Sequence, residues 1–450
     1  MKILTIPMAA TLLAVATITP AFPQGGQLIP PVGPPAETMK TLERIAPRIP
    51  VVEGAPGVTI AGPLGIGPGE RITISEPGHY FLTENVQISE NSPPITITGS
   101  NVTLDLMGHS ILPSVGTGNT TSAIRITGNA SHVTIQNGHI LPSSNQFTRG
   151  ILADVGTSDI LVRNISIRET ITAGITLNSE NSEVRNCTVV QTGSGSVPAN
   201  PHGIKAGRVY QSVALEISNT AIEAGLVQDC IAESTGGGTA IIADRVIRTQ
   251  AHSRFAAIEA TTLVHRSEGI TTNSNLIYDA IVCLNGTVSH SRGVSNTGTG
   301  IRAKIVTHST GISTGTFNEF MHGIHATNYV AFSYGSSVSG HGIQSDWMVH
   351  SSHSETTSGN QNRHAITSGL VVNSTAFVPG FGKGSALVGG VVINSYGHSN
   401  GRDGISAGLV PHSYGRGMPD GFQSAGISAG VAVGSYAEEG ENITFKADMP

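Results

Sequence analysis

The stretch from residue 322 to residue 364 has the side chains best suited to chemistry. It holds six of the 17 histidines and the single tryptophan of the chain. An imidazole can transfer protons near neutral pH, and an indole ring gives a sugar an apolar face to stack on. The candidate catalytic residues are His353, His341 and Arg363. The candidate ligand-binding residues are Trp347, Asp346, His322 and His325. The alternative is that all of them are turn and face residues of one locally bulged repeat.

Two further candidate ligand-binding residues, Arg248 and Arg266, stand at equivalent positions of consecutive repeats, so they would stack one layer apart. A guanidinium group can grip a carboxylate through two parallel hydrogen bonds, which makes the pair a candidate uronate site. The alternative is two solvated corner residues. His290 and His308 repeat in the same way, but two imidazoles do not complete a metal site, and we predict no metal.

The composition indicates that short β-strands and turns position these side chains. With 56 glycines in 450 residues, 12% charged residues and 4% aromatic residues, the chain cannot fill a wide core with large side chains. It suits many thin β layers closed by small polar turns. The net charge is −6 and no basic cluster is present, which argues against a nucleic-acid partner. Cys187, Cys230 and Cys283 show no disulfide pattern, and we expect small buried residues there.

The N-terminal segment, residues 1–21, has a basic start, a mostly apolar run and small residues before a cleavage point at Ala21. These features predict a secretory signal peptide, and hence a secreted protein at the cell surface, in the periplasm or outside the cell. Residues 22–36 are a Pro/Gly-rich linker, and residues 37–69 are expected to form a short capping helix and a lead-in. No later stretch reaches the roughly 18 apolar residues of a membrane span.

Residues 70–436 repeat. In the first half, units 24 to 29 residues long begin at Ile124, Ile151, Ile175 and Ile204, and each contains three short alternating strands. One asparagine per unit separates the second strand from the third. Three strands per turn wind into a prism whose layers are about 4.8 Å apart, with the asparagine at a corner. We predict an all-β chain: a single right-handed parallel β-helix of about fifteen coils, followed by a C-terminal tail at residues 437–450.

The second half has shorter units of 18 to 24 residues. The predicted corner column is Gln211, Asp229, Arg248, Arg266, His290, His308, Phe332, His350, Asn373, Asn394 and His412. The Ser, Thr or Cys that follows each corner is expected to point inward and to bond its copies along the stack. His353 falls where nearly every other unit has Gly or Ala, so we expect that it does not fill the usual small inward niche. A left-handed helix with hexapeptide steps fits some coils of this half but not the first half.

These repeats, with the opening "EPGHYFLTENVQIS…ITITGSNVTLDLMGHSI" at 76–111 and the ending "ITFKADMP", resemble right-handed parallel β-helix proteins of the pectate-lyase-like superfamily. The likeness covers residues 70–436 and points to an uncharacterised exported bacterial subgroup. It implies the fold. The superfamily contains lyases, hydrolases, epimerases, adhesins and tailspikes, so it does not by itself imply an activity.

Lyases that the resemblance suggests combine clustered acids, which bind Ca²⁺, with a basic residue. Here Asp154, Asp159, Asp229, Asp244 and Asp279 are scattered, so we predict no cofactor, with Ca²⁺ needed only if the chain is such a lyase. Polygalacturonase-like hydrolases carry Gly-His-Gly and Arg-x-Lys elements. The chain has both, at 340–342 and 302–304, but in reversed order and without the paired carboxylates of acid–base catalysis.

Two functions follow. The first is a non-catalytic exported protein that binds extracellular polysaccharide or a cell-surface component. The alternative is a carbohydrate-active enzyme, a lyase or epimerase of acidic polysaccharide. The monotonous repeats and the missing acid–base pair favour the first, whereas the 322–364 stretch favours the second.

Overall fold

The computed structural model describes residues 48–61, 71–88, 93–113, 120–141, 147–193, 201–273, 276–316, 321–357, 363–380, 384–417, 425–438 and 444–445. Within these ranges the chain forms 41 β-strands and no helix. None of the described residues belongs to a helix long and apolar enough to cross a membrane. The predicted signal peptide, linker and capping helix lie outside the described residues.

The strands of the first half are β1 Arg48–Pro50, β2 Val58–Ala61, β3 Arg71–Ile74, β4 Gly78–Phe81, β5 Val86–Ile88, β6 Ile95–Ile97, β7 Val102–Asp105, β8 Ser110–Pro113, β9 Thr120–Ile126, β10 Ser131–Ile140, β11 Phe147–Ala153, β12 Ser158–Arg168, β13 Ala173–Leu177, β14 Glu183–Arg185 and β15 Thr188–Val190. The coils of this half are wide because their inward positions carry large residues, with Tyr80, Phe147 and Ile72 among the largest fully buried side chains.

The second half contains β16 His202–Tyr210, β17 Val213–Ile217, β18 Thr220–Gln228, β19 Ile231–Ser234, β20 Ile241–Ile247, β21 Gln250–Ser253, β22 Ile258–His265, β23 Glu268–Thr271, β24 Ile281–Ser289, β25 Arg292–Ser295, β26 Ile301–Thr307, β27 Thr310–Ser313, β28 Ile324–Ala331, β29 Tyr334–Ser337, β30 Ile343–Ser345, β31 Met348–His350, β32 His353–Thr356, β33 Ile366–Val372, β34 Thr375–Val378, β35 Leu387–Ile393, β36 Tyr396–Ser399, β37 Ile405–Pro411, β38 Tyr414–Gly417, β39 Ile427–Val433, β40 Tyr436–Glu438 and β41 Thr444–Phe445.

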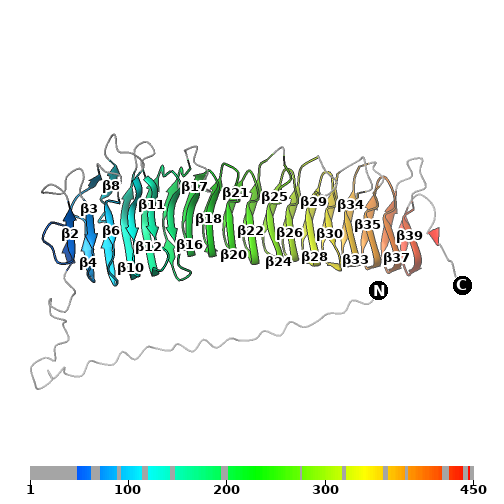
Figure 1. Ribbon diagram of the computed structural model, residues 1–450. Helices are drawn as coiled ribbons and strands as arrows, with labels where there is room; N and C mark the ends of the chain where they lie inside the picture. Colours follow the sequence, from blue (N-terminus) through cyan, green and yellow to red (C-terminus); the bar gives the residue numbers. More distant parts are fainter. Residues whose placement is uncertain are drawn as a thin grey trace, which may run out of the picture. The chain divides into compact units, whose positions relative to one another are not determined.

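Each strand pairs in parallel with the equivalent strand one turn later, as β16 does with β18 and β18 with β20. The result is a right-handed parallel β-solenoid of about 15 turns, as predicted (Figure 1). Because the solenoid is right-handed, the left-handed alternative does not describe this chain. At the N-terminal end of the solenoid, β2 runs antiparallel to β3.

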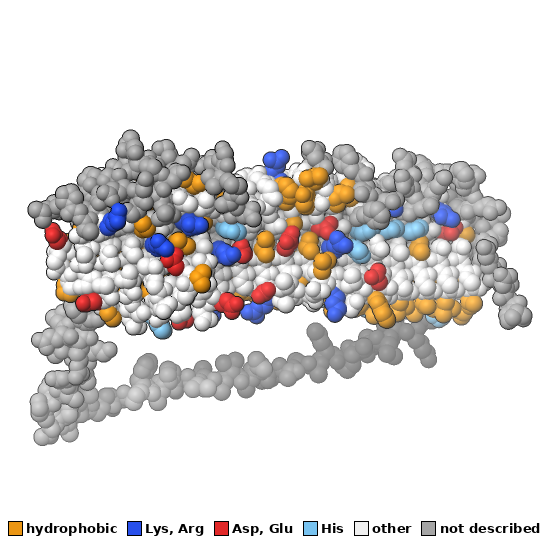
Figure 2. Space-filling model, in the orientation of Figure 1, with side chains coloured by type: hydrophobic (Ala, Val, Ile, Leu, Met, Phe, Trp, Pro, Cys, Tyr) orange, Lys and Arg blue, Asp and Glu red, His pale blue; other side chains and the backbone are white. Residues whose placement is uncertain are grey.

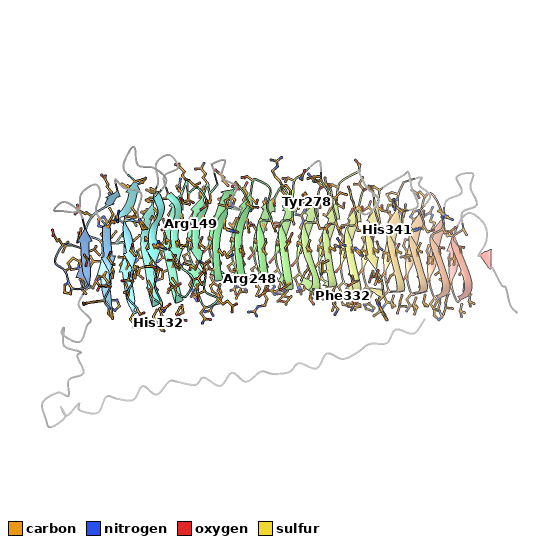
Figure 3. All side chains as sticks on the ribbon, viewed as in Figure 1. His132, Arg149, Arg248, Tyr278, Phe332 and His341 are labelled. Carbon is orange, nitrogen blue, oxygen red and sulfur yellow. The ribbon has the colours of Figure 1, made fainter. Side chains whose placement is uncertain are left out.

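Each coil of the second half has three faces. The first face begins at an inward isoleucine, such as Ile204, Ile222 or Ile241, and these side chains are fully buried. The second face carries an inward valine five to seven residues later, such as Val209 or Val227. The third face follows a sharp corner and is built by the short strands β17, β19, β21 and their copies. The corner side chains Arg248 and Phe332 lie along one edge of the solenoid (Figure 3).

The corner residues adopt the left-handed backbone conformation that the spacing predicted. Their φ angles run from 46° to 60° at Asn137, Asn164, Asn186, Gln211, Asp229, Arg248, Arg266, His290, His308, Phe332, Ser351, Asn373, Asn394 and His412. At this corner one residue with φ above zero turns the chain from the second face to the third, because the left-handed conformation bends the strand sharply. Nearly the whole predicted column is confirmed.

One coil departs from the prediction by one residue. The inward residue of β31 is Val349, which pairs with Val330, so the corner is Ser351 rather than His350. His353 consequently pairs with Tyr334 and points outward, while Ser354 fills the small inward niche. The register prediction that made His353 look exceptional was wrong, because six residues separate the inward Ile343 and Val349, whereas five is the commonest spacing in this half.

The inward hydroxyl after each corner forms a ladder along the stack. Ser333 Oγ accepts the backbone N–H of Ser309 on the preceding coil at 3.2 Å and donates to the carbonyl of Ala331 at 2.7 Å. The same pattern runs from Ser267 to Ser413 in successive coils. The hydroxyls were expected to bond one another. They instead bond the backbone, because the corner turns one N–H per coil out of the strand pairing and that group needs an acceptor.

Cys187, Cys230 and Cys283 are buried and free of disulfides, as expected. Cys187 and Cys230 occupy this ladder position, where they replace the usual hydroxyl. Burial raises the pKa of the Cys187 thiol to about 12 and those of Cys230 and Cys283 to about 11. These residues act as small apolar filling.

Candidate functional site: a groove along the junction of the first and second faces

The first and second faces meet at a shallow bend without breaking the strands, and small residues line it. Ala206, Ala224 and Ala243 point inward there, Gly225 leaves the outside open, and the loop at Glu180 packs directly on Gly207. Gly207 has to be glycine, since a Cβ would lie 1.8 Å from the carbonyl oxygen of Glu180. The bend forms an open groove of about 550 Å³ that crosses five successive strands, β13, β16, β18, β20 and β22. We call it the junction groove.

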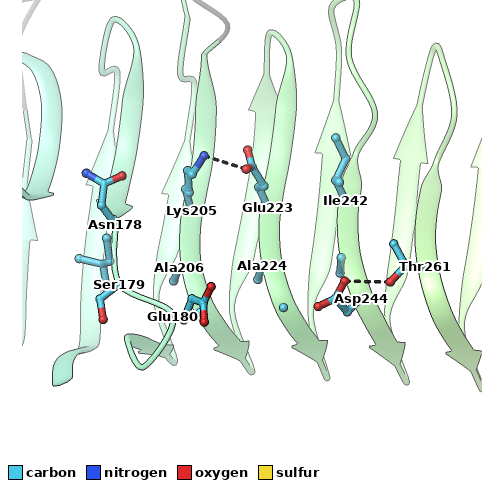
Figure 4. Close-up of a pocket in the computed structure, with 14 residues that line it drawn as sticks. Asn178, Ser179, Glu180, Lys205, Ala206, Glu223, Ala224, Ile242, Asp244 and Thr261 are labelled. Atoms are coloured by element: carbon cyan, nitrogen blue, oxygen red, sulfur yellow. Dashed lines mark hydrogen bonds and ion pairs between the residues drawn. The ribbon is translucent and has the colours of Figure 1, made fainter. Parts of the chain in front are cut away.

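Charged side chains stand along the junction groove (Figure 4). Lys205 Nζ lies 2.7 Å from Glu223 Oε1, and the two residues are neighbours in one outward column. His202 Nδ1 lies 3.4 Å from the other Glu223 oxygen. Burial lowers the pKa of His202, with Lys205 adding to this and Glu223 opposing it. Glu223 is therefore held by cationic and polar neighbours.

Two other carboxylates are open to solvent. Asp244 accepts a hydrogen bond from Thr261 Oγ1 at 2.8 Å, and its side chain is exposed. Glu180 is exposed on the loop after β13, at the end of the groove. With Glu223 offset by Lys205, Glu180 and Asp244 leave the groove acidic. Its chemistry is that of hydrogen-bond acceptors above a floor of alanine, glycine and the half-exposed side chain of Ile242.

Sequence reasoning did not find this groove. Lys205 and Glu223 were available as a signal, because they occupy the same place of consecutive Gly-Ile-x-Ala and Ala-Ile-x-Ala units, where outward neighbours of opposite charge are one layer apart. Asp244 was noted only as one of several scattered acids. The bend that gathers these side chains depends on residue sizes at the junction, which the repeat pattern alone did not reveal.

The predicted residues of the 322–364 stretch fall into different parts of the prism. Trp347, 73% exposed, and Asp346 stand at the junction, between β30 and β31. His353 lies on the third face, with its ring stacked on Tyr334 at 5.6 Å. The structure therefore does not gather Trp347 and His353 into one site.

Two of the predicted residues, His322 and His341, form a column of their own together with His364. His322, His341 and His364 each stand two residues before an inward isoleucine, and their rings stack at 5.2 and 5.4 Å. The Nδ1 atom of each ring accepts the backbone N–H of the equivalent residue in the next coil, at 3.1 to 3.2 Å. Asp279 and Asp403 accept the same N–H groups in other coils. We call this the histidine column, and its hydrogen bonds are structural.

Burial keeps the histidine column neutral. It lowers the pKa of His322 to about 2 and that of His341 to about 4, with the neighbouring imidazoles adding to the effect. The positive charge of Arg363 lowers the pKa of His322, His341 and His364 further. His325 packs edge-on against His322 at 5.4 Å, and its pKa is also lowered by burial. A neutral imidazole with Nδ1 occupied keeps its proton on Nε2.

The two predicted arginines do stack at the corner, but their surroundings differ. Arg248 makes a two-pronged ion pair with Asp229, with Nε–Oδ1 at 2.6 Å and Nη2–Oδ2 at 2.8 Å, and these hydrogen bonds lower the pKa of Asp229. Arg266 is exposed beside it. Next along the column, the His290 and His308 rings stack at 4.7 Å and 2°. Among the described residues, no three His, Cys, Asp or Glu side chains are grouped to hold a metal ion.

Comparisons with known proteins add little. No protein family matches the chain, and no curated protein matches it either. Among solved structures, the crystal structure of Dettilon tailspike protein is similar over 80% of this chain and 62% of that chain, with 13% identity and a TM-score of 0.19. The chain thus spans less than two thirds of that protein. A similarity this low carries no argument about function, and membership of the pectate-lyase-like superfamily stays a prediction.

Proposed function

We propose that this protein is an exported, non-catalytic polysaccharide-binding protein of the cell surface or extracellular matrix, and that a glycan chain lies along the junction groove. The observation that carries the proposal is the groove itself, an open channel with both polar and apolar lining that crosses the strands of five consecutive coils in the stacking direction. A channel of this form suits an extended ligand with repeating hydroxyl groups rather than a compact small molecule, which is usually enclosed.

The side chains favour a neutral glycan. The exposed carboxylates of Glu180 and Asp244 can accept hydrogen bonds from sugar hydroxyls, and Lys205 can donate one. The apolar floor, which includes Ile242, can face the C–H groups of a sugar ring. A uronate chain would place its carboxylates beside Glu180 and Asp244, and like charges repel.

The exposure of the same carboxylates supports a binding role. A pair of carboxylates that cleaves glycosides needs one member desolvated so that it keeps a proton near neutral pH. Glu180 and Asp244 are both exposed to water. The alternative of a polysaccharide lyase usually combines a Ca²⁺ site of clustered acids with a basic residue. The export part of the proposal depends on the sequence of residues 1–21.

Affinity electrophoresis tests the binding site. The purified protein would be run through gels that contain galactomannan, mixed-linkage glucan or polygalacturonate. We expect retardation by a neutral polysaccharide, and at least a tenfold loss of affinity in the double variant Glu180→Gln, Asp244→Asn. The control Glu216→Gln, Glu233→Gln removes the same charge from the third face and should bind normally.

The same samples test catalysis. Reducing ends and the absorbance of unsaturated products would be followed over a day of incubation. Product that appears with the native protein and vanishes in the Glu180→Gln, Asp244→Asn variant would establish an enzyme and end the proposal. If retardation is unchanged in that variant, the junction groove is not the polysaccharide-binding site.

A further inference from the structure

A second groove lies at the corner where the chain turns from the second face to the third. It is open, has a volume of about 470 Å³ and spans four successive coils. Its two borders are the corner column and the first outward column of the third face. The side chains on these borders are Arg248, Arg266, His290 and His308 in the first column and Gln250, Glu268, Arg292 and Thr310 in the second. We call it the corner groove, and it shares no residue with the junction groove.

The corner groove gathers positive charge on a protein that has few charges. Three of its lining residues are arginines and two are histidines, whereas Glu268 is the single carboxylate among them. The chain as a whole has a net charge of −6, and only 12% of its residues are charged. On the side of the solenoid seen in Figure 2, basic side chains are spread out, many of them beside an acidic one. Three guanidinium groups along one groove are therefore unusual in this chain.

The three arginines differ in their partners. Arg248 forms the two-pronged ion pair with Asp229 described above, and Arg292 Nη1 lies 2.5 Å from Glu268 Oε1. Arg266, on the coil between them, has neither a hydrogen bond nor an ion pair with any of the described residues. Two carboxylates thus offset two guanidinium groups, and the positive charge of Arg266 is left without a counter-charge.

The pKa of His265 reports the same excess of positive charge. His265 ends β22, and its ring packs edge-on against that of His290 at 5.4 Å. Burial lowers the pKa of His265, and the charges of Arg266, His290 and Arg248 lower it further. An anion bound in the corner groove would therefore meet a favourable potential.

The backbone makes arginine an expensive choice at this corner. Arg248 and Arg266 both have a φ of 50°, in the left-handed region where asparagine is favoured because its side chain can hydrogen-bond locally. Asn373 and Asn394 occupy the same corner in later coils. The two arginines also stand one layer apart, at about 4.8 Å, so their like charges repel. Natural proteins usually break such local rules where a function requires it.

We propose that the corner groove binds a tetrahedral oxyanion, a phosphate or sulfate group, at Arg266, with Arg292 and His290 as further hydrogen-bond donors. The guanidinium group of Arg266 has all five of its N–H donors available and can bind two oxygens of one anion side by side. The donors reach the groove from two columns and from neighbouring coils, so they approach an anion from different directions. The oxygens of a tetrahedral anion point in several directions, whereas the two oxygens of a carboxylate lie in one plane.

Isothermal titration calorimetry tests the site at pH 7.5 and low ionic strength, where charge interactions are least screened. Inorganic phosphate and inorganic sulfate are the probes, and acetate is the carboxylate control. We expect either probe to bind at least about fivefold more tightly than acetate, because it can use donors on both borders. Because the groove is open, the group can be a free ion, an ester on a sugar chain or a lipid headgroup. Dextran sulfate against dextran, and phosphatidylglycerol against phosphatidylcholine vesicles, separate the last two sources from the free ion.

Three variants locate the site. In Arg266→Gln the affinity for phosphate should fall about tenfold, because a charge-assisted contact with two oxygens is lost. In Glu268→Gln the affinity should rise, since Arg292 is released from its ion pair. The control Arg254→Gln removes an exposed arginine that does not line the groove and should bind as the native protein does. Thermal unfolding of each variant confirms that it folds.

Three results would overturn the proposal. The first is phosphate and sulfate binding no tighter than acetate binding, and the second is an equal loss of affinity in Arg266→Gln and Arg254→Gln, which would reveal a general effect of net charge. The third is weaker phosphate binding in Glu268→Gln. The oxyanion site does not rest on the proposed function. Retardation by a neutral polysaccharide should be unchanged in Arg266→Gln, so either proposal can fail while the other stands.

Discussion

At the scale of the residue, the corner position shows how one backbone angle shapes each coil. The side chains there differ widely, from Asn394 to Phe332, yet their φ angles agree within a few degrees, at 47° and 49°. The left-handed conformation costs most L-residues roughly 1–2 kcal/mol, and asparagine less, because its side chain can hydrogen-bond locally. The corner therefore requires a particular backbone conformation and not a particular side chain, so different side chains can stand there.

We predict that Asn394→Ala lowers the free energy of unfolding by about 1 kcal/mol, because alanine pays the left-handed penalty that asparagine partly avoids. Asn394→Gly should be close to the native value, since glycine adopts this conformation without strain. Urea unfolding followed by circular dichroism measures both. Equal destabilisation by alanine and glycine would show that the asparagine side chain, rather than the backbone angle, is what matters.

The hydroxyl ladder gives a second residue-scale prediction. In Ser333→Ala the N–H of Ser309 loses its acceptor in a buried place, so the free energy of unfolding should fall by about 1–3 kcal/mol. The control is Ser336→Ala on the outward side of the same coil, expected to change stability by less than about 0.5 kcal/mol. Indistinguishable unfolding midpoints for the two variants would mean that water satisfies the N–H of Ser309.

At the scale of the element, the histidine column links coils through neutral rings. Its imidazoles have lowered pKa values because the buried site disfavours their charged form. An unfolded imidazole takes up a proton near pH 6.5, whereas folded His341 does so only at about pH 4. Between these values the unfolded chain binds more protons than the folded chain, so stability must fall as the pH falls.

We therefore predict that the free energy of unfolding decreases between about pH 6.5 and pH 4, by roughly 2–3 kcal/mol for His341 alone. His341→Gln should be less stable than the native protein at pH 8, but its stability should depend less on pH. Urea titrations at half-unit pH steps measure both slopes. The control His132→Gln removes an exposed histidine, and parallel slopes for all three proteins would contradict the prediction.

The sequence predicted the elements better than the site, and the reasons are physical. Repeated Gly-Ile units and one corner residue per unit determine strand pairing directly, because each inward side chain must meet its copy in the next coil. Counting failed at Ser351, where a single added residue before Met348 shifted the register. The junction groove was missed because its walls come from strands one turn apart and from the loop at Glu180, and its depth comes from the absence of a side chain at Gly225.

At the scale of the whole solenoid, each coil contacts mainly its two neighbours, so a coil is a removable unit. Gly389 and Ala407 are register partners on β35 and β37. We predict that deletion of residues 390–407, one complete turn, leaves a folded protein with the same circular dichroism per residue. Deletion of residues 390–398, half a turn, should give aggregates, since every later inward residue then faces the wrong side. Comparable soluble yields of the two deletions would contradict this prediction.

The hydroxyl ladder also has a direction. From Ser267 to Ser413, each serine after a corner donates its backbone N–H to the serine hydroxyl of the coil that comes later in the chain, as Ser309 does to Ser333. When a chain emerges N-terminus first, from a ribosome or a translocation pore, the last coil formed has a corner N–H that does not yet have its hydroxyl acceptor. Each newly arrived turn supplies the acceptor for the turn before it and brings one further N–H that needs an acceptor, so we expect the coils to be added in chain order, starting from the N-terminal end.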